Sequence, residues 1–170
     1  EMLDGVAMDL DYDAYPGFTE LTLYVHRRGG APALLAAEIL GYQDRRATPR
    51  FAHEAGALLL LFELLCDVRS HARLGRFYLP TDEMQRFGVD PGALLAAQTT
   101  DRVRQLFAFQ AERIHAYHHR ALEYLPDGDR YAQRGLLIRL ELALALLAEI
   151  AEDGYRLLEQ RTHLTPLRKL

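Results

Sequence analysis

The sequence has one cysteine, no run of apolar residues long enough to cross a bilayer, and no excess of positive charge. The lone Cys66 excludes an intrachain disulfide and a zinc site built from cysteines. The longest apolar stretches are interrupted by Glu63 and Glu141, so they predict core helices rather than membrane spans, which need about 20 apolar residues. The formal net charge of -4 argues against a nucleic-acid partner, because binding to phosphates requires clustered Lys and Arg.

Alternating strand patterns are also nearly absent, whereas apolar residues at helical spacing recur from end to end. With 49% apolar and 26% charged residues, the chain is expected to form one all-α domain, a single helical bundle over residues 1–170. The last long helix is predicted over residues 129–160, and its apolar residues, spaced by three and four, predict a buried face. That face consists of Leu136, Leu140, Ala143, Leu147 and Ile150.

Glycine, proline and capping residues predict where the other helices begin and end. A helix from Phe18 is expected to end at Gly29 and Gly30. Thr48 followed by Pro49 is typical of a helix start, with the threonine hydroxyl as the cap, and predicts a long helix that ends near Arg69. The pair Thr165-Pro166 predicts a further helix at the end of the chain.

The end of this long helix carries the most informative motif. It reads Asp67-Val68-Arg69-Ser70-His71 and continues to Gly75-Arg76-Phe77-Tyr78-Leu79-Pro80. This resembles the second aspartate-rich motif of the squalene/phytoene synthases, N-x-x-R-D-V-x-E-D before G-R-x-Y-L-P. In that family two aspartates, one helical turn apart, hold magnesium against a prenyl diphosphate. Asp67 matches the first aspartate, and His71 stands in the place of the second.

Other segments extend the resemblance along essentially the whole chain. Residues 3–10 are similar to the family's L-I-D-G-x-x-x-D segment, with Asp9 at its acidic position. Tyr24 matches the tyrosine of the L-Y-C-Y segment, which the family uses in diphosphate departure or proton handling. Tyr155 matches a terminal tyrosine, which the resemblance places in the cavity wall. The resemblance further implies that Arg76 and Tyr78 brace or contact the diphosphate.

The resemblance implies an all-α isoprenoid synthase fold and a magnesium cofactor. The chain is expected to correspond to roughly the C-terminal two thirds of a family domain, without its first aspartate-rich helix. A cytoplasmic location follows from the same resemblance, with contact to a membrane surface as the alternative, because relatives handle lipids.

Glu63, Asp67 and His71 are spaced four apart, so they share one helix face if the helix persists. Carboxylates suit magnesium, whereas imidazole suits zinc or a later transition metal better. Glu63 with Asp67 forms an acidic pair that could hold magnesium one turn earlier than in the family. The alternative is a solvated helix end, with His71 near the negative pole of the helix dipole.

The departures from the family pattern gather at its polar site positions. Leu60, Glu63 and Cys66 replace a glutamine, an asparagine and an arginine, and Arg27 and Arg28 stand where small or apolar residues are usual. Two arginines could neutralise a diphosphate, but they are poor lining for a cavity that shelters carbocations. Two functions therefore stay open. One is the head-to-head joining of prenyl diphosphates with magnesium, and the other is a non-catalytic protein that binds a prenyl lipid or an assembly partner.

Overall fold

The computed structural model describes residues 1–96 and 98–159, and within them it contains helices and no strand. An isolated bridge joins Ala14 to Phe77. The all-α prediction is thus confirmed. In chain order the helices are α1 (Met2–Asp11), α2 (Phe18–Val25), the π-helical turn η1 (His26–Gly30), α3 (Ala31–Leu40), α4 (Ala47–Cys66), α5 (Val68–Arg73), α6 (Thr81–Arg86), the 3-10 turn η2 (Pro91–Leu95), α7 (Asp101–Tyr124), the 3-10 turn η3 (Asp127–Asp129) and α8 (Arg134–Glu152).

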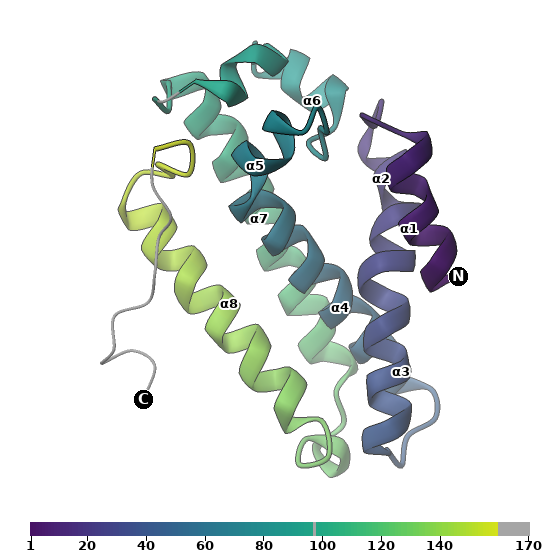
Figure 1. Cartoon of the computed structure of the whole chain (residues 1–170). Coiled ribbons are helices and arrows are strands. Elements are labelled where there is room, and N and C mark those ends of the chain that lie inside the picture. Colours follow the sequence, from purple (N-terminus) through teal and green to yellow (C-terminus); the bar gives the residue numbers. More distant parts are fainter. Residues whose placement is uncertain (97, 160–170) are drawn as a thin grey trace.

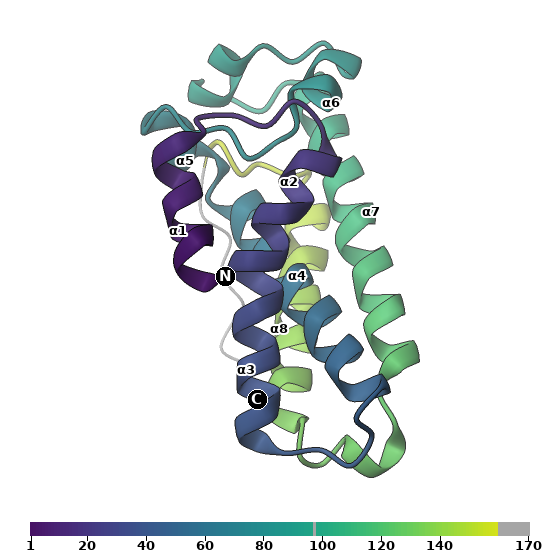
Figure 2. The ribbon, with the colours of Figure 1, turned by 90° about the vertical axis from the view of Figure 1, so that its right-hand side faces the viewer.

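Helix α4 lies at the centre of the bundle and contacts α7, η1, α3 and α8 (Figure 1). Turning the molecule shows α1 packed outside the continuous column of α2, η1 and α3 (Figure 2). Phe51, Ala55 and Leu58 of α4 are fully buried, as expected for a helix surrounded by others. None of the described helices is long and apolar enough to cross a membrane.

The predicted break at Gly29 and Gly30 is wrong, because the helix continues through η1 to Leu40. The glycines serve close packing instead. A Cβ atom on Gly29 would lie 2.5 Å from the carbonyl oxygen of Gly56, and one on Gly56 would lie 2.2 Å from the carbonyl oxygen of Gly29. The two backbones therefore touch, and the π turn occurs at this contact. Such turns are frequent at functional sites.

The start of α4 also differs from the prediction. Asp44 lies just before the helix, and its Oδ1 accepts hydrogen bonds of 2.8 Å from the backbone N–H groups of residues 46 and 47. The Thr48 hydroxyl does not cap; it donates to Oδ2 of Asp129 at 2.6 Å. Asp129 also accepts from the backbone N–H of Gln43, so this carboxylate ties the α3–α4 loop to the turn before α8.

The two long helices end earlier than predicted. Helix α4 ends at Cys66, and α5 follows after Asp67 (φ -99°, ψ 14°), where the sequence predicted one helix to Arg69. Helix α8 spans Arg134–Glu152 rather than residues 129–160, because Gly154 and Tyr155 adopt positive φ angles that end it. The predicted buried face of α8 is confirmed at all its positions. The helix predicted from Thr165 lies outside the described residues.

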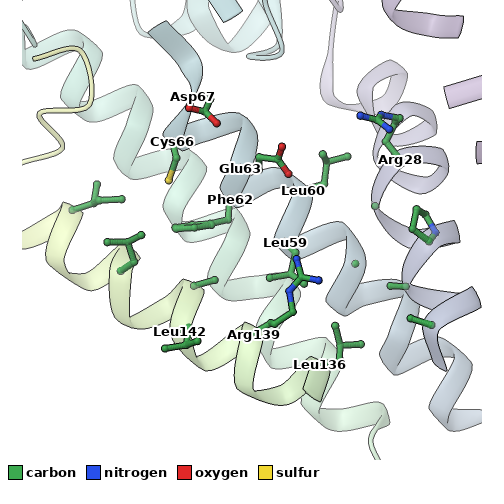
Figure 3. A pocket seen from close by; sticks show the side chains of 18 of the residues that line it. Arg28, Leu59, Leu60, Phe62, Glu63, Cys66, Asp67, Leu136, Arg139 and Leu142 are labelled. Atoms are coloured by element: carbon green, nitrogen blue, oxygen red, sulfur yellow. The ribbon is translucent and has the colours of Figure 1, made fainter. Parts of the chain in front are cut away.

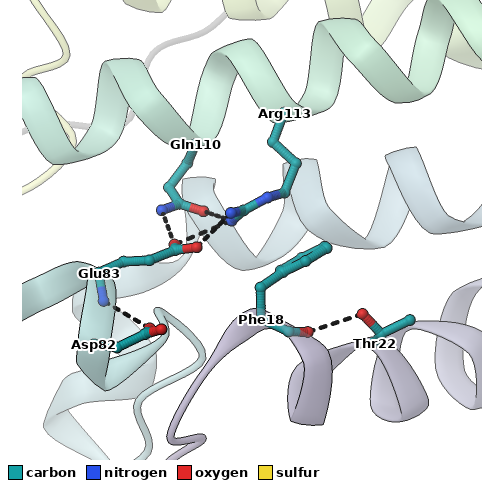
Figure 4. A network of polar contacts seen from close by, with 6 residues as sticks. All are labelled: Phe18, Thr22, Asp82, Glu83, Gln110 and Arg113. Carbon is teal, nitrogen blue, oxygen red and sulfur yellow. Dashed lines mark hydrogen bonds and ion pairs between the residues drawn. The ribbon is translucent and has the colours of Figure 1, made fainter.

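A group of paired polar side chains, here called the polar clamp, joins α6 to α7 beside α2 (Figure 4). It consists of Glu83, Gln110 and Arg113. Gln110 Nε2 and Arg113 Nη1 donate to Oε2 of Glu83 at 2.8 and 3.1 Å, and Arg113 forms an ion pair with the same carboxylate. The guanidinium also lies 3.8 Å from the centre of the Phe18 ring. Every member of the clamp thus has a partner within the fold.

Candidate functional site

A cavity of ≈ 880 Å³ lies between α4, α8 and the η1–α3 column (Figure 3). Its walls are mostly apolar, with Leu59 and Phe62 from α4 and Leu142, Leu146 and Ile150 from α8. The apolar residues of α8 line it because they recur at helical spacing on the face turned toward α4. The cavity has the size and the mostly apolar lining of a small-molecule site.

Acidic groups enter the cavity from one face of α4. Gly56, Leu60, Glu63 and Asp67 follow one another at spacings of four, three and four, and all four line the cavity. The side chain of Glu63 projects from α4 on the side of Arg28, and that of Asp67 lies at the end of the helix beside Cys66 (Figure 3). The structure thus brings together the two carboxylates that the sequence selected as metal ligands.

His71 is separated from this pair. It is not among the described residues that line the cavity, and its ring packs edge-on against Tyr78 with the ring centres 4.8 Å apart. Its Nδ1 is buried and has no hydrogen-bond partner in the described part of the chain. Burial lowers the pKa of His71, so the neutral ring is favoured. Of the three residues predicted to share one helix face, Glu63 and Asp67 therefore line the cavity, whereas His71 packs against Tyr78.

Asp9 gathers two tyrosines that are distant in sequence. The Tyr78 hydroxyl donates to Oδ1 of Asp9 at 2.6 Å, and the Tyr24 hydroxyl donates to Oδ2 at 3.4 Å. The two tyrosine rings stack with their centres 5.1 Å apart. Burial, the largest cause, raises the pKa of both tyrosines, so the hydroxyls keep their protons and act as donors. The family resemblance indicated Asp9, Tyr24 and Tyr78 separately, and the structure places them in one cluster.

Arg28 connects this cluster to the cavity. It lies in the π turn η1, lines the cavity and faces α4 (Figure 3). Its pKa is raised, first by hydrogen bonding to the Tyr24 hydroxyl and further by the charges of Asp9 and Glu63. The aliphatic part of Arg28 crosses α1 at Gly5, where an added Cβ atom would lie 3.0 Å from the arginine Cγ. Arg28 thus lies between the Asp9 cluster and the acidic wall of the cavity.

The structure places two other predicted residues away from the cavity. Arg76 borders a small pocket beside His71 and Tyr78. Tyr155 follows α8, packs against the core and is not among the described cavity residues. Burial, followed by the charge of Glu112, raises its pKa. The roles in diphosphate contact and cavity lining that the resemblance gave to these two residues stay predictions.

Sequence reasoning missed two residues near the site. Arg139 lines the cavity from α8, and the signal for it was a charged residue beside the apolar face that contains Leu136. Tyr15 lies in the aromatic cluster, with its ring centre 5.7 Å from that of Tyr24. No motif marked it, because it lies in the loop between α1 and α2 and only the folded chain brings it to Tyr24.

The donor atoms of the cavity suit only a partial metal site. Among residues 1–96 and 98–159 no group of three His, Cys, Asp or Glu side chains could hold a metal ion. Glu63, in the last turn of α4, and Asp67, directly after that helix, nevertheless both offer carboxylates to the cavity. Magnesium commonly binds to one or two carboxylates and completes its coordination with water and substrate phosphates. The pair therefore fits a magnesium ion that a phosphate ligand helps to hold, and His71 has no part in it.

Solved structures with the same architecture include squalene synthase HpnC from Alicyclobacillus acidocaldarius. It matches with a TM-score of 0.79 and 24% identity over 91% of this chain and 58% of its own chain, which shows a common fold. The isoprenoid synthase type of helical bundle is thereby confirmed.

Sequence comparison gives the family. Phytoene synthase of Mycobacterium tuberculosis is 35% identical over 76% of this chain and 44% of its own length. Phytoene synthase 3 of Zea mays is 30% identical over 100% of this chain and 41% of its own length. The chain thus spans less than half the length of these curated relatives. The family profile of squalene/phytoene synthase matches residues 1–168. The chain therefore belongs to the squalene/phytoene synthase family.

Proposed function

We propose that this chain binds a prenyl diphosphate in the cavity of α4, α8 and the η1–α3 column and takes part in joining two such molecules head to head. The observation that carries the proposal is a cavity of ≈ 880 Å³ with apolar walls and charged groups from η1 and α4. Members of the family bind prenyl diphosphates and are generally metal-dependent. The chain spans less than half the length of the two phytoene synthases compared above, so the complete reaction is proposed here and not shown.

The walls match the hydrocarbon part of such a ligand. Burial of each CH₂ group stabilises a complex by about 0.8 kcal/mol, so a long isoprenoid chain gains most of its affinity from walls such as Phe62, Leu142 and Ile150. Aliphatic and aromatic walls also keep water away from a carbocation. A cavity of this kind binds the prenyl chain and protects a reactive intermediate from hydrolysis.

The polar side of the cavity matches the diphosphate. Glu63 and Asp67 would hold magnesium, which supplies positive charge to the departing diphosphate when it is bound. The neutral hydroxyls of Tyr24 and Tyr78 donate to Asp9 and fix the orientation of that carboxylate. Hydrogen bonding between Tyr24 and Arg28 places Tyr24 at the edge of the charged region. Its one O–H donates to Asp9 over 3.4 Å, so it would have to turn from that carboxylate to donate a hydrogen bond to a leaving oxygen.

A turnover assay tests the proposal. The intact protein would be incubated with magnesium and radiolabelled farnesyl or geranylgeranyl diphosphate, and both hydrocarbon product and released pyrophosphate would be measured. We expect product with the native protein and its loss in Asp67→Asn, because that change removes a carboxylate of the cavity wall. Glu63→Gln should lower magnesium-dependent affinity for the diphosphate; unchanged affinity would exclude the displaced acidic pair as the metal site.

A second function is favoured by one observation, the position of His71 outside the cavity where a relative has an aspartate. A protein with this change could retain the cavity to bind a prenyl lipid without turnover, or to serve an assembly partner. The same assay distinguishes the two functions. Magnesium-independent binding of the prenyl lipid, with no hydrocarbon and no pyrophosphate, would identify the non-catalytic function.

A further inference from the structure

Arg27 and Arg28 are adjacent in sequence, but only Arg28 is among the described residues that line the cavity. Both belong to η1, whose π-helical geometry changes the direction of successive side chains relative to an α-helix. Arg28 points from η1 toward the wall that carries Glu63 (Figure 3). The two arginines therefore differ in surroundings, and each can serve as a control for the other.

Close backbone packing fixes the position of Arg28. The next residue, Gly29, touches Gly56 of α4, and a Cβ atom on Gly29 would also lie 2.9 Å from the Cβ of Leu60. Gly56 and Leu60 belong to the same helix face as Glu63 and Asp67. The contact between η1 and α4 thus holds the backbone of Arg28 beside the acidic end of the cavity wall.

The side chain of Arg28 is held as well. Its aliphatic part lies on α1 at Gly5, one turn before Asp9, where an added Cβ would be within 3.0 Å of Cγ and 3.1 Å of Cδ. Hydrogen bonding to the Tyr24 hydroxyl raises the pKa of its guanidinium. A guanidinium has five N–H donors in one plane, so a single tyrosine leaves donors for a second group. The group that matches such a planar set of donors in two places at once is a phosphate or a carboxylate.

We propose that Arg28 binds the diphosphate of the prenyl ligand directly and gives the cavity its preference for a charged over an uncharged isoprenoid. This inference rests on the proposed function. Three carboxylates, those of Asp9, Glu63 and Asp67, give the region a negative charge that by itself would repel a diphosphate. Bound magnesium would offset that charge beside Glu63 and Asp67, and Arg28 would donate to the diphosphate from the opposite side, η1.

The experiment measures binding rather than turnover. Affinities of the intact protein for farnesyl diphosphate and for farnesol would be determined by titration calorimetry, each with magnesium and with a chelator. Arg28→Met and Arg28→Lys are the test variants, and Arg27→Met is the matched control. Thermal unfolding of each variant verifies that it is folded. If Arg28→Met does not fold, Arg28→Lys, which keeps the aliphatic part and the charge but not the planar donors, decides the question.

We expect Arg28→Met to weaken the binding of farnesyl diphosphate by about ten- to a hundredfold, the range typical of losing hydrogen bonds to charged groups. Farnesol affinity should not change, because it lacks the group that Arg28 binds. Arg28→Lys should show an intermediate loss, since a point charge replaces the two-point contact. Arg27→Met should bind both ligands like the native protein.

Two other results would contradict the inference and can be told apart. If both ligands bind and Arg28→Met changes neither affinity, Arg28 serves only as an internal counter-ion for Asp9 and Glu63, and the inference is wrong while the proposed function stands. If neither farnesol nor farnesyl diphosphate binds, the proposed function fails and the inference fails with it.

Discussion

The two sides of α4 are built differently. Toward α6 and α7, charged side chains are paired within the fold, as in the polar clamp and in the ion pair between Arg120 and Glu54, whose Nε and Oε2 atoms are 3.0 Å apart. Toward η1, two glycines let backbones touch, and beside them lies a cavity with Arg28 in its wall. Polar groups on the first side hold helices together. Polar groups on the second side face space that a ligand can fill.

This difference predicts which substitutions should change stability and which should change ligand affinity. Changes on the α7 side should alter the free energy of unfolding, because each removed partner leaves another group buried without compensation. Changes of the charged cavity side chains on the η1 side should alter ligand affinity more than stability, because these side chains border space that a ligand can fill. The glycine contact is the exception on that side, because it packs one backbone against another. Four predictions compare the stability of the two sides, starting with the largest effect.

Breaking the polar clamp should have the largest effect on stability. Glu83→Ala leaves the guanidinium of Arg113 buried without its carboxylate, with only 15% of its side chain exposed. Loss of one partner of a buried ion pair typically costs about 3–5 kcal/mol. Urea unfolding monitored by circular dichroism measures the loss. The double variant Glu83→Met, Arg113→Met is the control, and it should recover most of the stability; if it is as unstable as Glu83→Ala, the ion pair is not the cause.

The glycine contact on the other side of α4 should be the next most sensitive. Gly56→Ala places a Cβ atom 2.2 Å from the carbonyl oxygen of Gly29, so η1 and α4 must move apart. We expect a loss of about 3 kcal/mol in the free energy of unfolding, in the upper part of the range for overpacking. Gly135→Ala is the matched control in α8, because nothing lies within 4 Å of its added Cβ. That variant should be as stable as the native protein or more so, and a loss equal to that of Gly56→Ala would contradict the packing argument.

The same contact shows which parts of the structure the sequence could predict. Helical periodicity predicted the architecture and the buried face of α8, because burial of an apolar stripe is a property of the segment itself. Gly29 was misread as a helix break. A glycine is needed there because the backbone of Gly56, in another helix, touches it. Thr48 was misread as a cap for a similar reason, since its hydroxyl finds Asp129 instead. Long-range partners decide these positions, and one sequence does not contain them.

In the candidate site, too, the sequence predicted what depends on local spacing and missed what depends on distant contacts. The spacing of Glu63 and Asp67 placed both carboxylates on one helix face, and the structure brings both to the cavity. His71 was assigned to the same column on the condition that the helix persists, but α4 ends at Cys66 and the imidazole packs on Tyr78 instead. The direction of Arg28 depends on the π turn, which no residue pattern indicated. Local spacing thus predicts a shared face only as far as the helix remains regular.

The tyrosine cluster allows a finer comparison between two buried hydroxyls. Tyr78 donates to Asp9 at 2.6 Å, whereas the Tyr15 hydroxyl is buried with no hydrogen-bond partner among the described residues. Tyr78→Phe should therefore cost about 1.5 kcal/mol, since it removes a hydrogen bond to a charged acceptor. Tyr15→Phe should leave the free energy of unfolding unchanged or raise it. Chemical denaturation of both variants measures the difference, and equal losses would show that ring packing, rather than hydrogen bonding, controls this cluster.

The smallest expected effect concerns the response to acid beside η1. The rings of His26 and His53 meet with Nδ1 and Nε2 2.9 Å apart, Glu54 lies on the other side of His53, and Glu1 lies beside His26. Burial, followed by the neighbouring charge of His26, lowers the pKa of His53. The unfolded chain, in which histidine has a pKa of about 6.5, then binds the proton more readily than the folded chain does.

The neutral His53 ring therefore makes its full contribution to the free energy of unfolding above about pH 6.5. This contribution decreases as the pH falls, until His53 is protonated in the folded chain too. His53→Gln removes the titrating ring, so its thermal unfolding temperature should fall less between pH 7.5 and pH 5 than that of the native protein, by about one or two degrees for a change of a few tenths of a kcal/mol. His119→Gln is the control, because that ring is largely exposed and far less constrained. If both variants keep the full acid response of the native protein, it arises elsewhere, and His71, whose pKa is also lowered by burial, is the next residue to replace.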